Sequence, residues 1–133
     1  MPDTKTITTY RRALFCGSVS GAVTTAIPPI THVAFGNGGV DSDGDPMRPS
    51  ESQTDVSNRI GIYPVASVTY PLDPAPRTTA RYVVEIPAGD LGGERINEAA
   101  LIDADGGAHV IITFYDQRKN LGVSKTFTFN DIF

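Results

Sequence analysis

The chain has 133 residues, of which 40% are hydrophobic and 20% charged, and its formal net charge is −4. This length fits one domain with a substantial core, and the balance of residues is that of a globular protein rather than a disordered one. The negative charge offers no basic surface for nucleic acid, and the single cysteine excludes an intramolecular disulfide, in keeping with assembly in a reducing cytoplasm.

Residues 1–29 predict a short helix followed by an extended arm. Apolar residues at helical spacing share one side of a helix over residues 8–18 and just beyond it: Ile7, Tyr10, Leu14 and Val19. Pro28-Pro29 ends the segment. The apolar run over residues 13–27 is interrupted by glycines and hydroxyl residues and is shorter than the ~18 residues that a membrane span needs. We therefore expect neither a targeting signal nor a membrane contact.

Segments that alternate apolar and polar residues predict strands at 30–35, 59–70, 78–86, 96–102, 110–115 and 123–133. Together with 13 glycines and 10 prolines, they indicate a mainly β fold. We expect one domain over residues 1–133, an antiparallel, β-sandwich-like domain of about six strands with one short N-terminal helix. Pro64 indicates an edge or a bulge in its strand, and Pro71, Pro74 and Pro76 predict a stiff turn.

Five of the six predicted strands have one face expected to meet the core. These faces are Val33 and Phe35; Ile60, Ile62, Ala66, Val68 and Tyr70; Ala80, Tyr82, Val84 and Ile86; Ile96, Ala100 and Ile102; and Val123, Phe127, Phe129 and Phe133. Between the strands, Asp105-Gly106 is a strong signal for a hairpin turn.

Residues 36–58 form a long polar connection between the first two predicted strands, and loops of this length are usually functional or mobile. At its start, Gly36-Asn37-Gly38-Gly39 predicts a tight turn that needs positive φ. A phosphate-binding loop is disfavoured there, because no helix and no suitably placed lysine follow. The loop also carries alternating carboxylates, Asp41, Asp43 and Asp45, which could surround a hard cation such as calcium.

The spacing of these carboxylates departs from the twelve-residue calcium loop. Gly44 comes one residue too early, and Glu51 stands at position eleven. A solvated acidic turn is the favoured interpretation, and a metal site remains the alternative. Elsewhere, His32, His109 and Cys16 have no partner at a spacing typical of a metal or catalytic site. We therefore expect no enzyme and no cofactor.

Glu98 lies among apolar neighbours on its predicted strand, sharing a face with Ile96, Ala100 and Ile102. A buried charge costs several kcal/mol unless it is paired or hydrogen-bonded. We predict that Glu98 meets backbone N–H groups or an arginine, with Arg59 the preferred partner. The alternative is that this face lies at a solvent-exposed edge.

Several of these segments occur in a characteristic order: the N-terminal helix, Ile30-Thr31-His32-Val33-Ala34-Phe35-Gly36-Asn37-Gly38-Gly39, the Pro/Asp-rich loop, Asn58-Arg59, Val84-Glu85-Ile86-Pro87, and Ile96 to Gly106. This order resembles the phage tail-collar fibre family, the N-terminal attachment domain of tail fibres in contractile-tailed phages. Its signature Arg-Glu-(Val/Ile)-Gly-Leu-Phe-Asp-x-Asp-Gly is matched by Glu98, Leu101, Asp103, Asp105 and Gly106. Asn97, Ala100 and Ile102 replace its arginine, glycine and phenylalanine.

The resemblance implies a structural virion protein, a baseplate or tail-fibre attachment component that acts by protein–protein assembly and has no catalytic residues. Its partners would be other tail, baseplate or tail-fibre proteins, and by family analogy it would form a homo-oligomer, a trimer. It would be made in the host cytoplasm and reside in the virion tail. Since the sequence ends at Phe133, we expect the attachment part without a shaft or receptor-binding tip. A calcium- or carbohydrate-binding β-sandwich module is the alternative, supported by the carboxylates at 41–45 alone.

Overall fold

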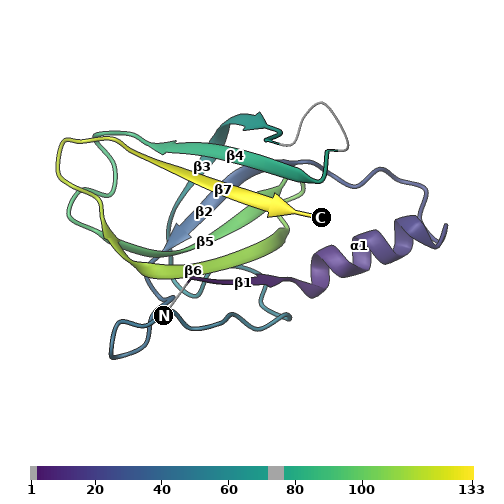
Figure 1. The fold of residues 1–133 in the computed structure, drawn as a ribbon, viewed down its shortest axis with the longest axis horizontal. Helices are drawn as coiled ribbons and strands as arrows, with labels where there is room; N and C mark the ends of the chain where they lie inside the picture. Colours follow the sequence, from purple (N-terminus) through teal and green to yellow (C-terminus); the bar gives the residue numbers. More distant parts are fainter. Residues whose placement is uncertain (1–2, 72–76) are drawn as a thin grey trace.

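The computed structural model describes residues 3–71 and 77–133, so Pro74 and Pro76 of the expected turn lie outside the described residues. Its elements are, in chain order, β1 (Thr4–Ile7), α1 (Thr9–Val19), β2 (Ile30–Gly36), β3 (Arg59–Thr69), β4 (Thr79–Ile86), β5 (Arg95–Asp103), β6 (Ala108–Arg118) and β7 (Lys125–Ile132) (Figure 1). Within the described ranges, no helix has the length and apolar character needed to cross a membrane.

The strands form one sheet in the order β1-β6-β5-β2-β3-β4-β7, and every neighbouring pair is antiparallel. The expectation of a mainly β, antiparallel fold with one short helix is confirmed. The described residues contain seven strands rather than about six, arranged as a single sheet. The additional strand, β1, has only 4 residues and pairs with β6, so it is too short to produce a clear alternation.

The sheet curls around its core, which brings its two edges towards each other (Figure 1). Lys5 of the edge strand β1 donates a hydrogen bond from Nζ to the backbone carbonyl of Asn130 in the other edge strand, β7, at 2.7 Å. A lysine side chain thus connects two strands that share no backbone pairing in the sheet order.

The inner face of the curled sheet holds the main core. Its members are Val33, Phe35, Ala80, Tyr82, Val84, Ile86, Ile96, Ala99, Leu101, Val110, Ile112, Phe114, Phe127 and Phe129. The faces expected for β2 and β4 are confirmed, and so is the Phe127–Phe129 part of β7. Phe35 is the aromatic centre of this core, with its ring centroid 4.8 Å from that of Phe127. The expectation was wrong for Val123 and Phe133, which lie outside β7 and are 55% and 62% exposed.

The expected face of β3 was wrong in part: Ile60 packs against the core as expected, but Val68 and Tyr70 are exposed. Tyr63 and Val65 pack against the core, whereas Ile62 is 40% exposed. β3 is a central strand, and the pairing with β4 shifts register between Val65 and Ser67, beside Pro64. The prediction of a bulge near Pro64 is therefore confirmed, whereas an edge position is excluded. Such a shift changes which face successive side chains occupy, and simple alternation cannot anticipate it.

A second, smaller core lies on the outer face of the sheet, where the 37–58 connection covers it. It consists of Ala34, Val56, Ala100, Ile102, Ala108 and Ile111. The pairing of β5 with β6 shifts register between Ile96 and Glu98. Ile96 consequently joins the inner core, whereas Glu98 lies with Ala100 and Ile102 beneath the connection, which corrects the expectation that all four share a face.

Candidate functional site: two buried carboxylates and an exposed arm

Glu98 is fully buried, at 0% exposure, which confirms that its carboxylate points away from solvent. Oε2 accepts hydrogen bonds from the backbone N–H groups of Gly38 at 2.8 Å and Asn58 at 2.9 Å. Oε1 accepts one from the backbone N–H of Ser57 at 2.7 Å. A single carboxylate therefore joins both ends of the 37–58 connection to β5, and it satisfies three backbone donors that would otherwise be buried without acceptors.

Arg59 is not the partner of Glu98, contrary to the preferred pairing. Its guanidinium forms an ion pair with Asp55 at 2.9 Å, and both side chains are more than one-third exposed. Asp55 precedes it by only four residues, so this local contact forms at little entropic cost. Backbone N–H groups, the other predicted type of partner, take the place of the arginine.

Gly36 and Gly38 make room for the Glu98 carboxylate. A Cβ on Gly36 would lie 2.4 Å from Glu98 Oε2 and 2.5 Å from the Asn58 carbonyl oxygen, and one on Gly38 would lie 2.9 Å from the Ser57 Cβ. Neither glycine has positive φ. The expectation of a turn that needs positive φ was therefore wrong, because close approach excludes a side chain here.

The Asp105-Gly106 hairpin is confirmed, with Gly106 at φ 88° in the left-handed region. Asp103 stabilises the turn through Oδ1, which accepts the backbone N–H groups of Asp105 and Gly107, each at 2.9 Å. Asp103, the first aspartate of the family-like signature, thus stabilises the hairpin turn, and its other oxygen faces the interior.

The carboxylates at 41–45 form a self-contained turn. Asp41 Oδ1 accepts the backbone N–H groups of Asp43 at 2.9 Å and Asp45 at 3.0 Å. In residues 3–71 and 77–133, no group of three or more His, Cys, Asp or Glu side chains is placed to hold a metal ion. His32 contacts Thr31 at 2.9 Å, and Cys16 is exposed on α1.

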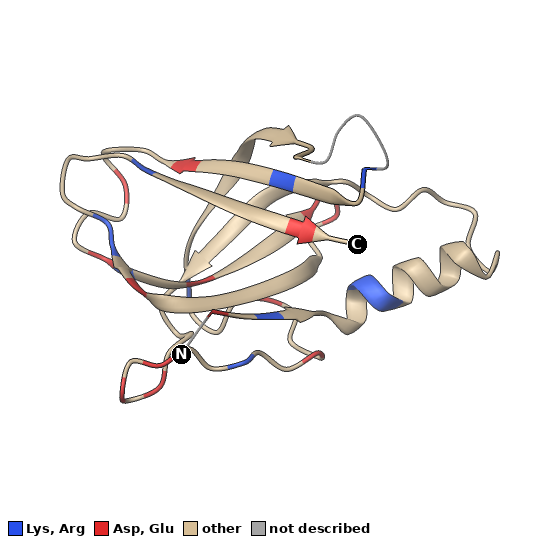
Figure 2. Cartoon of the chain, in the orientation of Figure 1, with Lys and Arg blue, Asp and Glu red and all other residues tan. Residues whose placement is uncertain are grey.

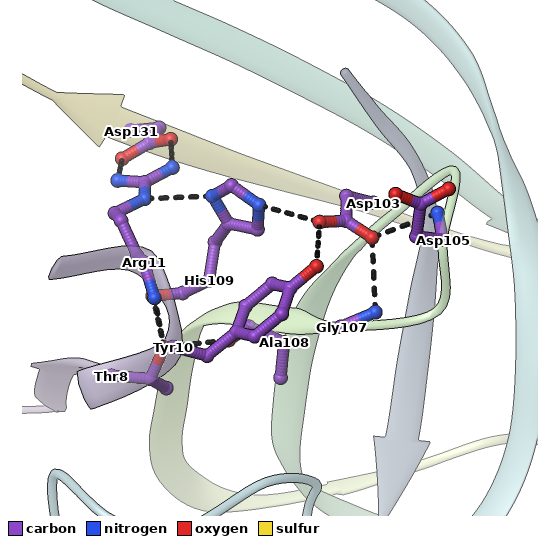
Figure 3. A network of polar contacts seen from close by, with 9 residues as sticks. All are labelled: Thr8, Tyr10, Arg11, Asp103, Asp105, Gly107, Ala108, His109 and Asp131. Carbon is purple, nitrogen blue, oxygen red and sulfur yellow. Dashed lines mark hydrogen bonds and ion pairs between the residues drawn. The ribbon is translucent and has the colours of Figure 1, made fainter. Parts of the chain in front are cut away.

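Buried polar side chains connect α1 to β5, β6 and β7 (Figure 3). Tyr10 donates a hydrogen bond from its hydroxyl to Asp103 Oδ2 at 2.7 Å, and His109 Nε2 lies 2.9 Å from the same oxygen. On the other side of the imidazole, Arg11 Nε lies 3.0 Å from His109 Nδ1. The Arg11 guanidinium then forms two bonds with Asp131, at 2.8 and 2.5 Å.

The pKa values in this network follow from burial and from these bonds. Burial alone would raise the pKa of Asp103, but hydrogen bonds led by that from Tyr10 outweigh it and lower the pKa below its usual 3.8. The same hydrogen bond raises the pKa of Tyr10 to about 12. Burial lowers the pKa of His109 below 6.5, with a further decrease from the charge of Arg11, while its hydrogen bond to Asp103 opposes the shift.

Both imidazole nitrogens of His109 are thus engaged by other protein groups. Sequence reasoning missed this network. Arg11 lies 98 residues before His109 and 120 before Asp131, so no local spacing signals their contact. The only available signal was a charged residue, Asp131, alternating with phenylalanines on an inward face.

α1 and residues 20–29 form an arm that projects beyond the end of the sheet (Figure 1). Residues 13–40 include no Asp, Glu, Lys or Arg, and Figure 2 shows the outer part of α1 without a charged residue. Val19 is 89% exposed and Val23 50% exposed. The expectation that Val19 lies on the packed side of the helix was therefore wrong.

A groove of about 410 Å³ lies where the base of the arm meets the end of β7. Its lining residues are Ile7, Arg11, Arg12, Phe15, Ile132 and Phe133. Phe15 stacks on Phe133 with their ring centroids 6.0 Å apart, yet Phe133 is 62% and Ile132 63% exposed. We call Val19, Val23, Ile132, Phe133 and this groove the arm surface.

The arm surface combines apolar side chains with few charges at one end of an otherwise charged molecule (Figure 2). Exposed apolar clusters of this kind mark contact sites for other macromolecules more often than isolated exposed side chains do. No family model, curated protein or solved structure matches this chain.

Proposed function

We propose that this protein is a structural subunit of a phage or phage-like contractile tail, an attachment component of the baseplate or tail fibre that acts by binding other proteins. The observation that carries the proposal is the arm surface, an exposed arm that is uncharged beyond Arg12, beside the largely apolar groove at the end of β7. The segments from Ile30 to Gly106 resemble the tail-collar fibre family in their order. This resemblance is the reason for proposing a contractile tail as the particle.

The roles of the signature residues support a scaffold function. Glu98 and Gly36 fix the 37–58 connection to the sheet, and Asp103 fixes the following hairpin. These residues stabilise loops and leave no reactive group directed at solvent. Shared residues that fix loops are expected in a family whose function depends on a rigid binding surface. In a family of enzymes, the shared residues would include groups that contact a substrate.

The distribution of charge supports contact through the arm. With a net charge of −4, copies of this chain repel one another at long range, and the acidic 41–45 turn adds to that repulsion locally. The arm surface has no acidic residue to add to this repulsion. Its exposed apolar side chains favour binding, because a partner removes them from water. We infer that the arm docks on a neighbouring tail or baseplate protein or on another copy, a trimer by family analogy, and that each stable contact buries more than ~1,000 Å².

The test uses two exposed valines at opposite ends of the sheet. Val19 lies on the arm and is 89% exposed, whereas Val123 lies in the β6–β7 connection and is 55% exposed. The chain is co-purified with the tail proteins encoded beside its gene, and its own oligomeric state is measured by analytical ultracentrifugation. Val19→Asp is expected to weaken assembly at least about tenfold, since a charge must be desolvated, and Val123→Asp is expected to leave assembly unchanged.

Two results would contradict the proposal. One is a wild-type chain that stays monomeric at micromolar concentration and binds none of the neighbouring tail proteins. The other is assembly that responds equally to Val19→Asp and Val123→Asp, since the arm would then have no special part in it. Neighbouring genes for sheath, baseplate or fibre proteins are a further expected observation.

A further inference from the structure

Two polar contacts attach the arm to the sheet, one from Tyr10 to Asp103 and one from Arg11 to Asp131, beside the stacking of Phe15 on Phe133. Within Thr9–Val19, Arg11 is the single buried side chain, and no α1 residue belongs to the main core cluster. The Arg11 guanidinium lies over the rings of Phe15 and Phe133, at 5.5 and 5.0 Å from their centroids, and binds Asp131 through two bonds. The surroundings of this one buried cation therefore contribute to the docked position of α1, together with the hydrogen bond from Tyr10 to Asp103.

His109 is a necessary part of those surroundings, and its protonation state is fixed by geometry. A guanidinium N–H can only donate, so His109 Nδ1, 3.0 Å from Arg11 Nε, must be the acceptor and carries no proton. Nε2 then carries the proton and donates it to Asp103 at 2.9 Å. The docked arrangement of α1 requires neutral His109 in this one tautomer.

Every element packed around His109 contributes a titratable or charged group. α1 contributes Arg11 and Tyr10, whose ring meets the imidazole edge-on with centroids 5.6 Å apart. β5 contributes Asp103. β7 contributes Asp131, which is bound to Arg11. β4 contributes Tyr82, which lines the same cavity as His109 and Arg11.

A second proton on this imidazole would have no acceptor. It would sit on Nδ1 and face the Arg11 N–H, placing two donors and two positive charges together at a site where both residues are at most 3% exposed. Asp103 already accepts from Tyr10, His109 and two backbone groups, and Asp131 is held by both arms of the guanidinium. The carboxylates of Asp103 and Asp131 therefore both have their hydrogen-bond partners already and are not oriented to accept a proton from His109 Nδ1.

We propose that His109 is an acid-sensitive latch for the arm: protonation at Nδ1 breaks the hydrogen bond from Arg11 and releases α1 from the end of the curled sheet while the sheet stays folded. Because burial and Arg11 lower the pKa of His109 in the docked state, docking is fully favoured above about pH 6.5 and is lost as the pH falls below it. The latch needs no partner, so it stands whether or not the arm is an assembly surface.

The chain is well suited to a direct distance measurement. Cys16 is its single cysteine and is exposed on α1, and Ser124 is exposed in the β6–β7 connection, at the opposite end of the sheet (Figure 1). With spin labels on Cys16 and on Ser124→Cys, pulsed electron spin resonance reports the distance between arm and sheet. We expect one narrow distribution at pH 7.5 and, at about pH 5, a second, broad population of at least about half the molecules, with an unchanged β-sheet circular dichroism spectrum.

Two glutamine variants separate His109 from the other histidine. In His109→Gln, the amide can donate to Asp103 and accept from Arg11 without any titratable proton, so the narrow distribution is expected to persist at both pH values. His32→Gln removes the other histidine, which hydrogen-bonds with Thr31, and is expected to keep the full acid transition. If His109→Gln folds poorly, ¹⁵N chemical shifts of the wild-type ring report the same latch through its tautomer.

Several outcomes would overturn the latch. They are a wild-type distance unchanged down to about pH 5, an acid transition that survives in His109→Gln, and a ring protonated on Nδ1 at pH 7.5. Loss of the sheet signal at the same pH as the arm would also overturn it, because α1 would then not be released separately. Failure of the assembly test with Val19→Asp would leave all of these readouts unaffected.

Discussion

Replacing Glu98 by glutamine tests the central structural claim about the 37–58 connection. The carboxylate accepts backbone N–H groups on both oxygens, two on Oε2 and one on Oε1. Whichever way the amide is oriented, its NH₂ group faces at least one backbone donor. That unsatisfied, buried N–H costs about 1–3 kcal/mol, and weakening the remaining charge-assisted bonds costs roughly 1 kcal/mol each.

The neutral amide also avoids the cost of burying a charge, which offsets part of this loss. We therefore expect Glu98→Gln to lower the free energy of unfolding by about 3 kcal/mol, measured by urea denaturation with an unchanged m-value. Arg59→Gln is the control, since its ion pair with Asp55 is half-exposed and is worth at most about 1 kcal/mol. A loss below about 1 kcal/mol for Glu98→Gln, or an equal loss for Arg59→Gln, would refute the reasoning.

Three further predictions concern the glycine turn, the tyrosine and the acidic turn. Gly36→Ala is expected to cost about 2–3 kcal/mol in a urea melt, because its Cβ would overlap Glu98, whereas Gly89→Ala, with nothing within 4 Å of its Cβ, should change stability by less than about 0.5 kcal/mol. The pKa of Tyr10 is raised to about 12, so the contribution of Tyr10 to the free energy of unfolding is complete below pH 10 and is lost as the pH rises towards 12. Tyr10→Phe should therefore remove the fall in stability between pH 10 and pH 12. An unchanged pH profile in this variant would contradict the hydrogen bond between Tyr10 and Asp103 as its cause. Millimolar calcium should leave the thermal midpoint unchanged, because the 41–45 turn is closed by its own backbone donors; a marked rise would restore the cation-binding alternative.

The parts of the fold that the sequence predicted are those where one strand face meets one core. In β4 the alternation of Ala80, Tyr82, Val84 and Ile86 corresponds directly to the inner face, because the pairing of β4 with β7 is regular throughout. β5 is different, since its residues are buried on both faces and its register shifts beside Asn97. The alternation of apolar residues indicated that Glu98 is buried. It could not indicate whether Glu98 lies in the inner core or under the 37–58 connection on the outer face.

The candidate site was less predictable because backbone groups and distant side chains build it. The donors to Glu98 are N–H groups of a loop, which every non-proline residue carries, so composition contains no trace of them. Arg59 was a reasonable partner by charge, but the nearer Asp55 competes for it. Arg11 and Asp131 are 120 residues apart in the chain, and a single sequence offers no means of pairing them.

The contact of Lys5 with Asn130 has a consequence for the solubility of the folded chain. An unpaired strand edge is a template on which another chain can add its own strand, and lysines on edge strands are one of the means by which proteins avoid this. Here the ammonium group occupies a carbonyl of β7 that an incoming strand would need, and the curl places the second edge close by. This contact therefore opposes edge-to-edge addition of another strand at β7.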